Sequence, residues 1–504
     1  MKKLLFIILM GFIFNTNAEL LKTPIIETQY GMIQGFQQND VNVFKGIPYA
    51  SDPFTTENRF KEPQPVSSWK GVRSCIDDSP VIQPGRTTPT SLVGETGDLT
   101  LNIWSPVKIK GALPVMVWIP GGAWIREDAD EAVYDGSRFA QKGVILVTVN
   151  YRVGVDGFMH FDNYPDNRGL LDQIAAMKWV KENISNFGGD PNNITLFGQS
   201  AGAGSVAIHL GNPETYDLFQ KAILQSPPVQ TLSIKDAERI RDVFAHNLAI
   251  SPDPDSISKV PFDVLVNNIL TIGQQLKDYD KWGKIALRGT VFLPVIDGKI
   301  IKKDPLENIK NNHPQKPIIV GSTDYESRLY LVPDNSINRI KKEDVVKTIK
   351  EMGLPESAYG IYKKYNVHKS DGDLYVALLS DYTFRMPAFD IAQMSKNVAP
   401  TWYYNFSWSS PAYDNKLGAA HFVDVPFVFD TIRTKEAQFF VGNQPPENLA
   451  QEMNDAWVSF AKTGEPGWEK CSQSHCDIKT FSVDNAKYRT QEKEIEQLWH
   501  GFSF

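Results

Sequence analysis

The most restrictive feature of the sequence is a serine between two glycines, in the pentapeptide Gly198-Gln199-Ser200-Ala201-Gly202. An apolar, β-rich run at 193–197 precedes it, and a segment predicted to be helical follows. A serine at such a strand-to-helix junction lies on a very tight turn, where a side chain two positions away on either side would collide with its surroundings. The two glycines therefore predict a sharp turn that exposes the Ser200 hydroxyl.

Elsewhere the chain alternates between short β-rich runs and longer helical patterns. This alternation is typical of strands that are joined by crossover helices in a largely parallel sheet. Most of the runs are apolar on both faces, as expected where helices cover both sides of the sheet. The segment 170–187 has apolar residues at helical spacing and ends at a pair of glycines. The sequence therefore predicts an α/β fold, with strands at 114–119, 144–150, 193–197, 222–225, 317–320 and 402–406.

One long segment, 236–396, mixes helices and loops between the predicted strands. We expect it to form helical excursions over the face that carries Ser200. Within it, the proline-containing stretch 251–261 is interpreted as a loop or excursion rather than part of the sheet core. Beyond it, a helix is expected at 447–462. The chain has 504 residues, of which 42% are hydrophobic and 22% charged, so a large globular core is expected. We predict a single domain at 19–504.

The first 18 residues have the pattern of a signal peptide. Two lysines are followed by an apolar run at 4–14 and then by small or polar residues up to Ala18. The apolar run is shorter than the ~20 residues that a membrane span requires. We therefore expect export to the periplasm or the medium, cleavage after Ala18, and no membrane span in the mature chain.

The cysteines and the net charge indicate whether disulfides, metal sites or nucleic-acid binding are to be expected. Export permits disulfides, and Cys471 and Cys476 are close enough in sequence for a small local loop, whereas Cys75 is expected to be buried. His475 lies beside this pair without the repeated spacing of a zinc site, so no metal and no cofactor are predicted. The net charge is −7 and no basic tract is present, which argues against nucleic acid as a partner. The oligomeric state is not predicted.

A serine hydroxyl needs a base to accept its proton and a carboxylate to orient that base. In chains that have this turn, the order is serine, acid, histidine. His421 is the best candidate for the base, because it lies in a loop of small residues after the predicted strand 402–406. The histidines that follow Ser200 outside its own helix are His246, His313, His368, His421, His475 and His500.

The acid should lie in a loop just after a strand of the sheet. The loop that follows the predicted strand 317–320 offers two carboxylates, Asp324 and Glu326. The residues alone leave the choice between them open.

The charge that develops on a substrate oxygen needs backbone N–H donors near Ser200. The glycine turn after the predicted strand 114–119 can supply two of them, from Gly122 and Ala123, and Ala201 can supply a third. Trp124 follows this turn directly. We interpret Trp124 as a candidate wall of the substrate pocket, although an aromatic residue there can equally belong to the core.

Taken together, these motifs resemble those of the type-B carboxylesterases, a family that includes bacterial para-nitrobenzyl esterases and cholinesterases. The resemblance extends over nearly the whole mature chain. It implies an α/β-hydrolase fold with helical cap insertions, and cleavage of a carboxylic ester through an acyl-enzyme on Ser200. Carried over by position, the acid is Glu326 and the base is His421. The matching stretches are 44–50, 59–60, 101–104, 150–154, 169–173, 187–191, 197–202, 224–226 and 297–298.

The sequence departs from the family pattern at several positions. Pro120 stands where the family usually has His or Tyr, Ala123 where many members have a third glycine, and Ser327 where a glycine is common. The stretch 96–99 lacks both the cysteine of the early disulfide in eukaryotic members and the tryptophan that cholinesterases place against choline. A quaternary ammonium substrate is therefore disfavoured, because no cation–π platform is evident there.

Two kinds of alternative remain open at this level. The family contains catalytically silent binding proteins that resemble neuroligins, but those lack the nucleophile, whereas this chain keeps serine, acid and histidine. The same three residues also serve lipases, lactonases, thioesterases and amidases. We therefore predict an enzyme that acts on a small-molecule ester, with its acyl preference unspecified.

Overall fold

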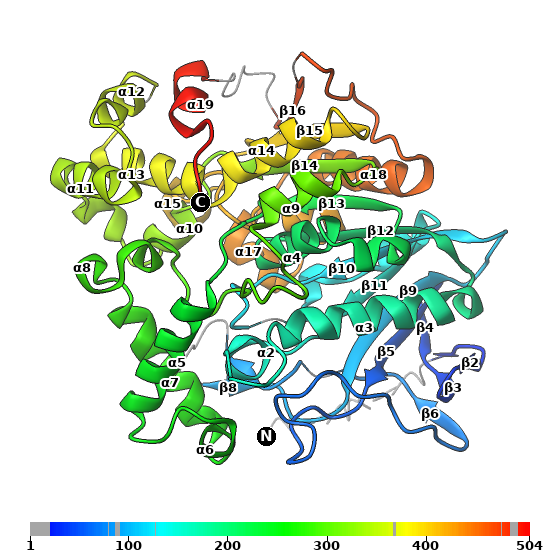
Figure 1. Cartoon of the computed structure of the whole chain (residues 1–504). Coiled ribbons are helices and arrows are strands. Elements are labelled where there is room, and N and C mark those ends of the chain that lie inside the picture. The colour runs from blue at the N-terminus through cyan, green and yellow to red at the C-terminus, as the bar shows by residue number, and fades with distance from the viewer. Residues whose placement is uncertain are drawn as a thin grey trace, which may run out of the picture.

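The computed structural model describes residues 21–78, 80–85, 91–126, 128–365, 369–474, 476–483 and 492–504, so the predicted signal peptide at 1–18 lies outside the described residues. An 11-stranded sheet runs through the molecule (Figure 1). Its strands, in spatial order, are β1 (Leu21–Lys22), β4 (Phe36–Gln38), β5 (Val41–Ala50), β9 (Leu99–Pro106), β11 (Ile145–Val149), β10 (Leu113–Ile119), β12 (Gly189–Gln199), β13 (Lys221–Gln225), β14 (Ile318–Thr323), β15 (Thr401–Phe406) and β16 (Ile478–Phe481).

The two parts of this sheet differ in strand direction. From β11 to β16 every neighbouring pair is parallel. From β1 to β9, and between β9 and β11, the pairs are antiparallel. The predicted large, mostly parallel sheet is confirmed, and the six predicted strands correspond to β10 to β15. The antiparallel part was not predicted, because β5 is buried along most of its length and shows no clear alternation of polar and apolar residues.

Alternate residues of the central strands face two different core clusters. On β10, Val115, Val117 and Ile119 belong to one cluster, while Met116 and Trp118 belong to the other. This is the two-residue repeat of an extended chain, applied to a sheet with both faces covered. Each face must therefore be packed by helices.

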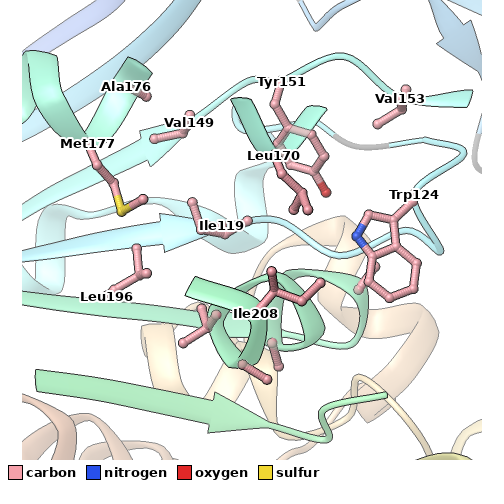
Figure 2. Close-up of a cluster of buried hydrophobic side chains, with 14 of the residues drawn as sticks. Ile119, Trp124, Val149, Tyr151, Val153, Leu170, Ala176, Met177, Leu196 and Ile208 are labelled. Carbon is pink, nitrogen blue, oxygen red and sulfur yellow. The ribbon is translucent and has the colours of Figure 1, made fainter. Parts of the chain in front are cut away.

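Helices α3 (Arg168–Asn183) and α4 (Ala201–Leu210) cover the first face. Figure 2 shows part of this cluster, in which Leu170 and Met177 from α3 and Ile208 from α4 pack with Ile119 and Leu196 of the sheet. Helix α18 (Glu447–Thr463) covers the second face with Met453, Trp457 and Phe460, which confirms the predicted helix near the C-terminus.

The segment 236–396 is mainly helical and is interrupted by β14. Helices α5 (Ile234–Asn247), α7 (Phe262–Gln275) and α8 (Tyr279–Trp282) lie to one side of the sheet (Figure 1). Helices α11 (Lys342–Met352), α12 (Ser357–Tyr365) and α13 (Asp371–Ser380) share a third core cluster with α19 (Lys493–Trp499).

The stretch 251–261 lies outside the sheet, as predicted, and contains the short helix α6 (Pro254–Ser258), which the sequence pattern did not predict. Pro254 occupies the first helical position, where the missing N–H of proline costs nothing. The Asp253 side chain caps the helix by accepting a hydrogen bond from the Ser256 backbone N–H. Proline here starts a helix rather than preventing one.

Two of the cysteines are linked. Cys471 and Cys476 form a disulfide, and Cys75 is free and buried. Burial raises the pKa of the Cys75 thiol to about 12, so this thiol stays protonated near neutral pH. Among the described residues, no helix combines the length and the apolar character needed to cross a bilayer.

Candidate active site

Ser200 lies on the sharp turn between β12 and α4. Its φ of 56° and ψ of −130° are unusual for a residue with a side chain, and its N–H donates to the Gln225 carbonyl at 3.0 Å. A Cβ at position 202 would lie 2.0 Å from the Ile119 oxygen, and one at position 198 would lie 2.6 Å from the Gly202 backbone. The glycines are therefore required because strand β10 passes against the turn.

Glu326 and His421 meet although 95 residues separate them in the sequence. The His421 Nδ1 atom lies 2.5 Å from Glu326 Oε2. The other oxygen, Oε1, accepts hydrogen bonds from the Ser226 hydroxyl at 2.5 Å and from the Thr323 N–H at 2.8 Å. Glu326 is fully buried, so these donors replace the water that its carboxylate has lost.

The backbone also joins the two loops. The Tyr325 N–H donates to the Ala419 carbonyl at 2.8 Å, and the His421 N–H donates to the Glu326 carbonyl at 3.1 Å. Asp324, the other candidate acid, accepts a hydrogen bond from Asn405 at 2.6 Å and makes none with His421. The structure thus brings Glu326, and not Asp324, to the imidazole.

The other candidate histidines lie elsewhere in the chain. His246 is in α5, His313 follows α9 (Pro305–Asn312), and His500 follows α19. His368 and His475 are outside the described residues.

His421 also contacts Gln199, Phe384 and Tyr330, and the Tyr330 ring centroid lies 5.9 Å from that of the imidazole. The Gln199 amide nitrogen lies 3.0 Å from Nε2 and 3.4 Å from Nδ1. An atom in line with the Nε2 lone pair would be much farther from Nδ1, so the amide lies against the face of the ring. The Phe384 ring stacks on the imidazole with 4.3 Å between centroids. Ser200 and His421 both belong to the described part of the chain, and no hydrogen bond joins them. His421 does contact Gln199, the residue that precedes Ser200.

The predicted N–H donors lie around Ser200. A Cβ at Gly121 would lie 3.1 Å from the Ser200 Cβ, so the glycine turn passes directly beside the serine. Gly122 and Ala123 have φ values of 127° and 57°, and neither N–H has a hydrogen-bond partner among the described residues. Ala201 is the first residue of α4, where helix geometry leaves the N–H without an intrahelical partner. These groups can bind an anionic oxygen.

Trp124 is 2% exposed and lies in the core cluster of Figure 2. Its indole N–H donates to the Ser205 hydroxyl at 3.1 Å, and its ring contacts Phe158. A role for Trp124 as a pocket wall therefore stays a prediction.

Ser226, Gln199, Phe384 and Asp424 were not among the predicted site residues. Ser226 follows β13 directly, and β13 lies beside β12, so a polar residue at the same end of a neighbouring parallel strand was the available signal. Asp424 accepts hydrogen bonds from Gln225 and Tyr404, each at 3.0 Å. Burial, and next the charge of Glu326, raise the pKa of Asp424 to about 6.

Comparison with known proteins identifies the family. The sequence model that describes the carboxylesterase family matches residues 22–497 of this chain. This chain belongs to the carboxylesterase family. It is 34% identical over 463 residues to the para-nitrobenzyl esterase of Bacillus subtilis (strain 168), a match that covers 88% of this chain and 91% of the relative. It is also 31% identical to the fumonisin B1 esterase of Sphingopyxis macrogoltabida, with 89% and 83% covered.

Solved structures agree with this assignment. A carboxylesterase of Geobacillus stearothermophilus has a TM-score of 0.80 at 33% identity, with 91% of this chain and 96% of that chain covered. A thermophilic PNB esterase has a TM-score of 0.82 at 32% identity, with 94% and 99% covered. The carboxylesterase described here thus has the predicted α/β-hydrolase fold and is a carboxylic ester hydrolase.

Proposed function

We propose that this carboxylesterase cleaves small-molecule esters with Ser200 as nucleophile, His421 as general base and acid, and Glu326 as the carboxylate that orients His421. The observation that carries the proposal is the bond from His421 Nδ1 to the buried Glu326 carboxylate. With its proton on Nδ1, the imidazole keeps a lone pair on Nε2 that can accept the proton of Ser200.

The reaction follows from this arrangement. Ser200 Oγ attacks the ester carbonyl while its proton passes to His421 Nε2, and the N–H groups of Gly122, Ala123 and Ala201 stabilise the oxyanion. His421 then protonates the departing alcohol, and a water molecule, activated by the same imidazole, releases the acid from Ser200. The Ser200 hydroxyl must turn toward Nε2 when substrate binds, because the two groups are not hydrogen-bonded beforehand.

A substrate comparison tests the ester specificity. The purified protein should hydrolyse p-nitrophenyl esters with saturable kinetics and should act more slowly on the p-nitroanilide with the same acyl group, because an amine leaves less readily than a phenol. A series of rising acyl length and one lactone would define the preferred substrate class. If a folded preparation cleaved none of these compounds, the proposed ester chemistry would be wrong.

We also propose that the enzyme is exported after cleavage behind Ala18. The sequence pattern at 1–18 supports this, as does the disulfide between Cys471 and Cys476, because such bonds persist mainly in oxidising compartments. Expression in a bacterial host followed by fractionation should recover the protein outside the cytoplasm, with Glu19 as the first residue by N-terminal sequencing. Recovery in the cytoplasm with Met1 or Lys2 at the N-terminus would contradict export.

A further inference from the structure

A second cluster of ionisable side chains lies outside the catalytic residues, where the segment that follows α2 (Gly154–Phe158) meets α5. Candidate ligand atoms of His160, Asp162 and Glu238 all lie within 4.8 Å of one another. His160 is only 6% exposed, and its Nε2 atom is buried without a hydrogen-bond partner. A buried ring nitrogen without a partner is costly. This one faces two carboxylates.

The other nitrogen of His160 is already held. Nδ1 lies 2.9 Å from one oxygen of Asp166 and 3.1 Å from the other. When this carboxylate holds a proton on Nδ1, Nε2 is free to bind a metal ion, and it lies 3.5 Å from Asp162 Oδ1. A carboxylate behind the far nitrogen is the arrangement that orients metal-binding histidines in proteins.

Asp162 has its second oxygen occupied in the same way. Oδ2 accepts a hydrogen bond from Arg241 Nη1 at 3.1 Å, so Oδ1 remains on the His160 side. The guanidinium is shared with Asp242, at 2.9 Å, which offsets its positive charge. Glu238, Arg241 and Asp242 are three and four residues apart on α5 and so lie on one face of that helix.

The local charge favours a cation. Four carboxylates, from Asp162, Asp166, Glu238 and Asp242, surround one guanidinium and one imidazole. Glu238 accepts no hydrogen bond from any other described residue, so its carboxylate is available to a ligand. One imidazole nitrogen and two carboxylate oxygens form a donor set that suits Zn²⁺ and related ions, whereas Mg²⁺ and Ca²⁺ prefer oxygen donors alone.

We propose that His160, Asp162 and Glu238 bind a divalent transition-metal ion of the Zn²⁺ type. The ion would connect the segment 159–167 to α5, and water would complete its coordination. Since the ligands come from separate parts of the chain that the fold brings together, binding should stabilise the folded state without taking part in ester hydrolysis.

Zinc titration of the full-length protein, after EDTA treatment and removal of the chelator, tests the site. By calorimetry the wild type should bind one equivalent of Zn²⁺ saturably. At a free concentration a hundred times the Kd, its melting temperature should rise by about 3 °C. Glu238→Gln keeps the shape of the side chain and should weaken binding at least about tenfold. The matched control is Glu343→Gln, at an exposed position on α11, and it should bind as the wild type does.

Several results would overturn the proposal. One is no saturable Zn²⁺ binding by the wild type, in which case an ion pair between protonated His160 and Asp162 accounts for the cluster. Another is equal affinity in the wild type and Glu238→Gln. A third is equally tight binding of Mg²⁺ or Ca²⁺, which would exclude a site with an imidazole ligand. Because His160 is buried and its replacement could impair folding, Glu238→Gln carries the test, with equal melting temperatures in EDTA as the check on folding.

Discussion

Replacing Ser200 by alanine should lower kcat for a p-nitrophenyl ester by about 10⁴- to 10⁶-fold, with little effect on folding. Removal of the nucleophile prevents the acyl-enzyme from forming, so only the binding site and the oxyanion donors remain. The φ of 56° at this position already accommodates a side chain, and alanine is smaller than serine. Steady-state kinetics and thermal unfolding of the two proteins measure both effects.

Covalent labelling identifies the serine independently. A fluorophosphonate probe should label the wild type once, on Ser200, and should not label the alanine variant. Ser67→Ala, at an exposed position, is the matched control and should be labelled and active like the wild type. If Ser200→Ala retained more than a small fraction of the activity, another residue would be the nucleophile.

Replacing Gly202 by alanine should destabilise the fold by about 3 kcal/mol, the upper end of the usual cost of overpacking, and abolish the esterase activity. The new Cβ would lie 2.0 Å from the Ile119 carbonyl oxygen and 2.9 Å from the Pro120 oxygen. Both oxygens belong to the backbone beside the glycine turn, so they cannot move aside as a flexible side chain could. Chemical denaturation gives the change in stability, and p-nitrophenyl ester hydrolysis gives the activity.

Gly360→Ala provides a matched helical control. Gly360 lies in α12, and beyond its chain neighbours and the helix's own backbone its Cβ would meet no described atom within 4 Å. Alanine is a better helix former than glycine, so this variant should be unchanged or more stable by roughly 0.5–1 kcal/mol. Equal stabilities for the two glycine variants would contradict the close packing inferred at the Ser200 turn.

Much of the parallel sheet could be predicted because its strands are short apolar runs bounded by turn residues. The strands from β10 to β15 all follow this pattern. Strand β5 is mostly buried without a clear alternation, and β1 and β4 are only two and three residues long, so their patterns carried little information. Helix α6 was not specifically predicted, because proline is favoured at the first position of a helix but disrupts its interior.

Some residues of the candidate site could likewise be predicted from the sequence, and others could not. Ser200 could be located because its turn places a requirement on neighbouring residues, and a local requirement of this kind is visible in the sequence. Between Asp324 and Glu326, only two residues apart, no local pattern could decide. The family resemblance favoured Glu326, and the tertiary structure places its carboxylate, and not that of Asp324, against His421.

By itself, the sequence determined the features that depend on neighbouring residues, namely the tight glycine turn at Ser200, the apolar strands and the amphipathic helices. Only the tertiary structure decided which distant side chains meet. Ser226 supports Glu326 because β13 and β14 are adjacent in the sheet. His160 faces Glu238 because α5 packs against the segment after α2. Such contacts depend on strand order and helix packing, which are properties of the whole fold and leave no local pattern in the chain.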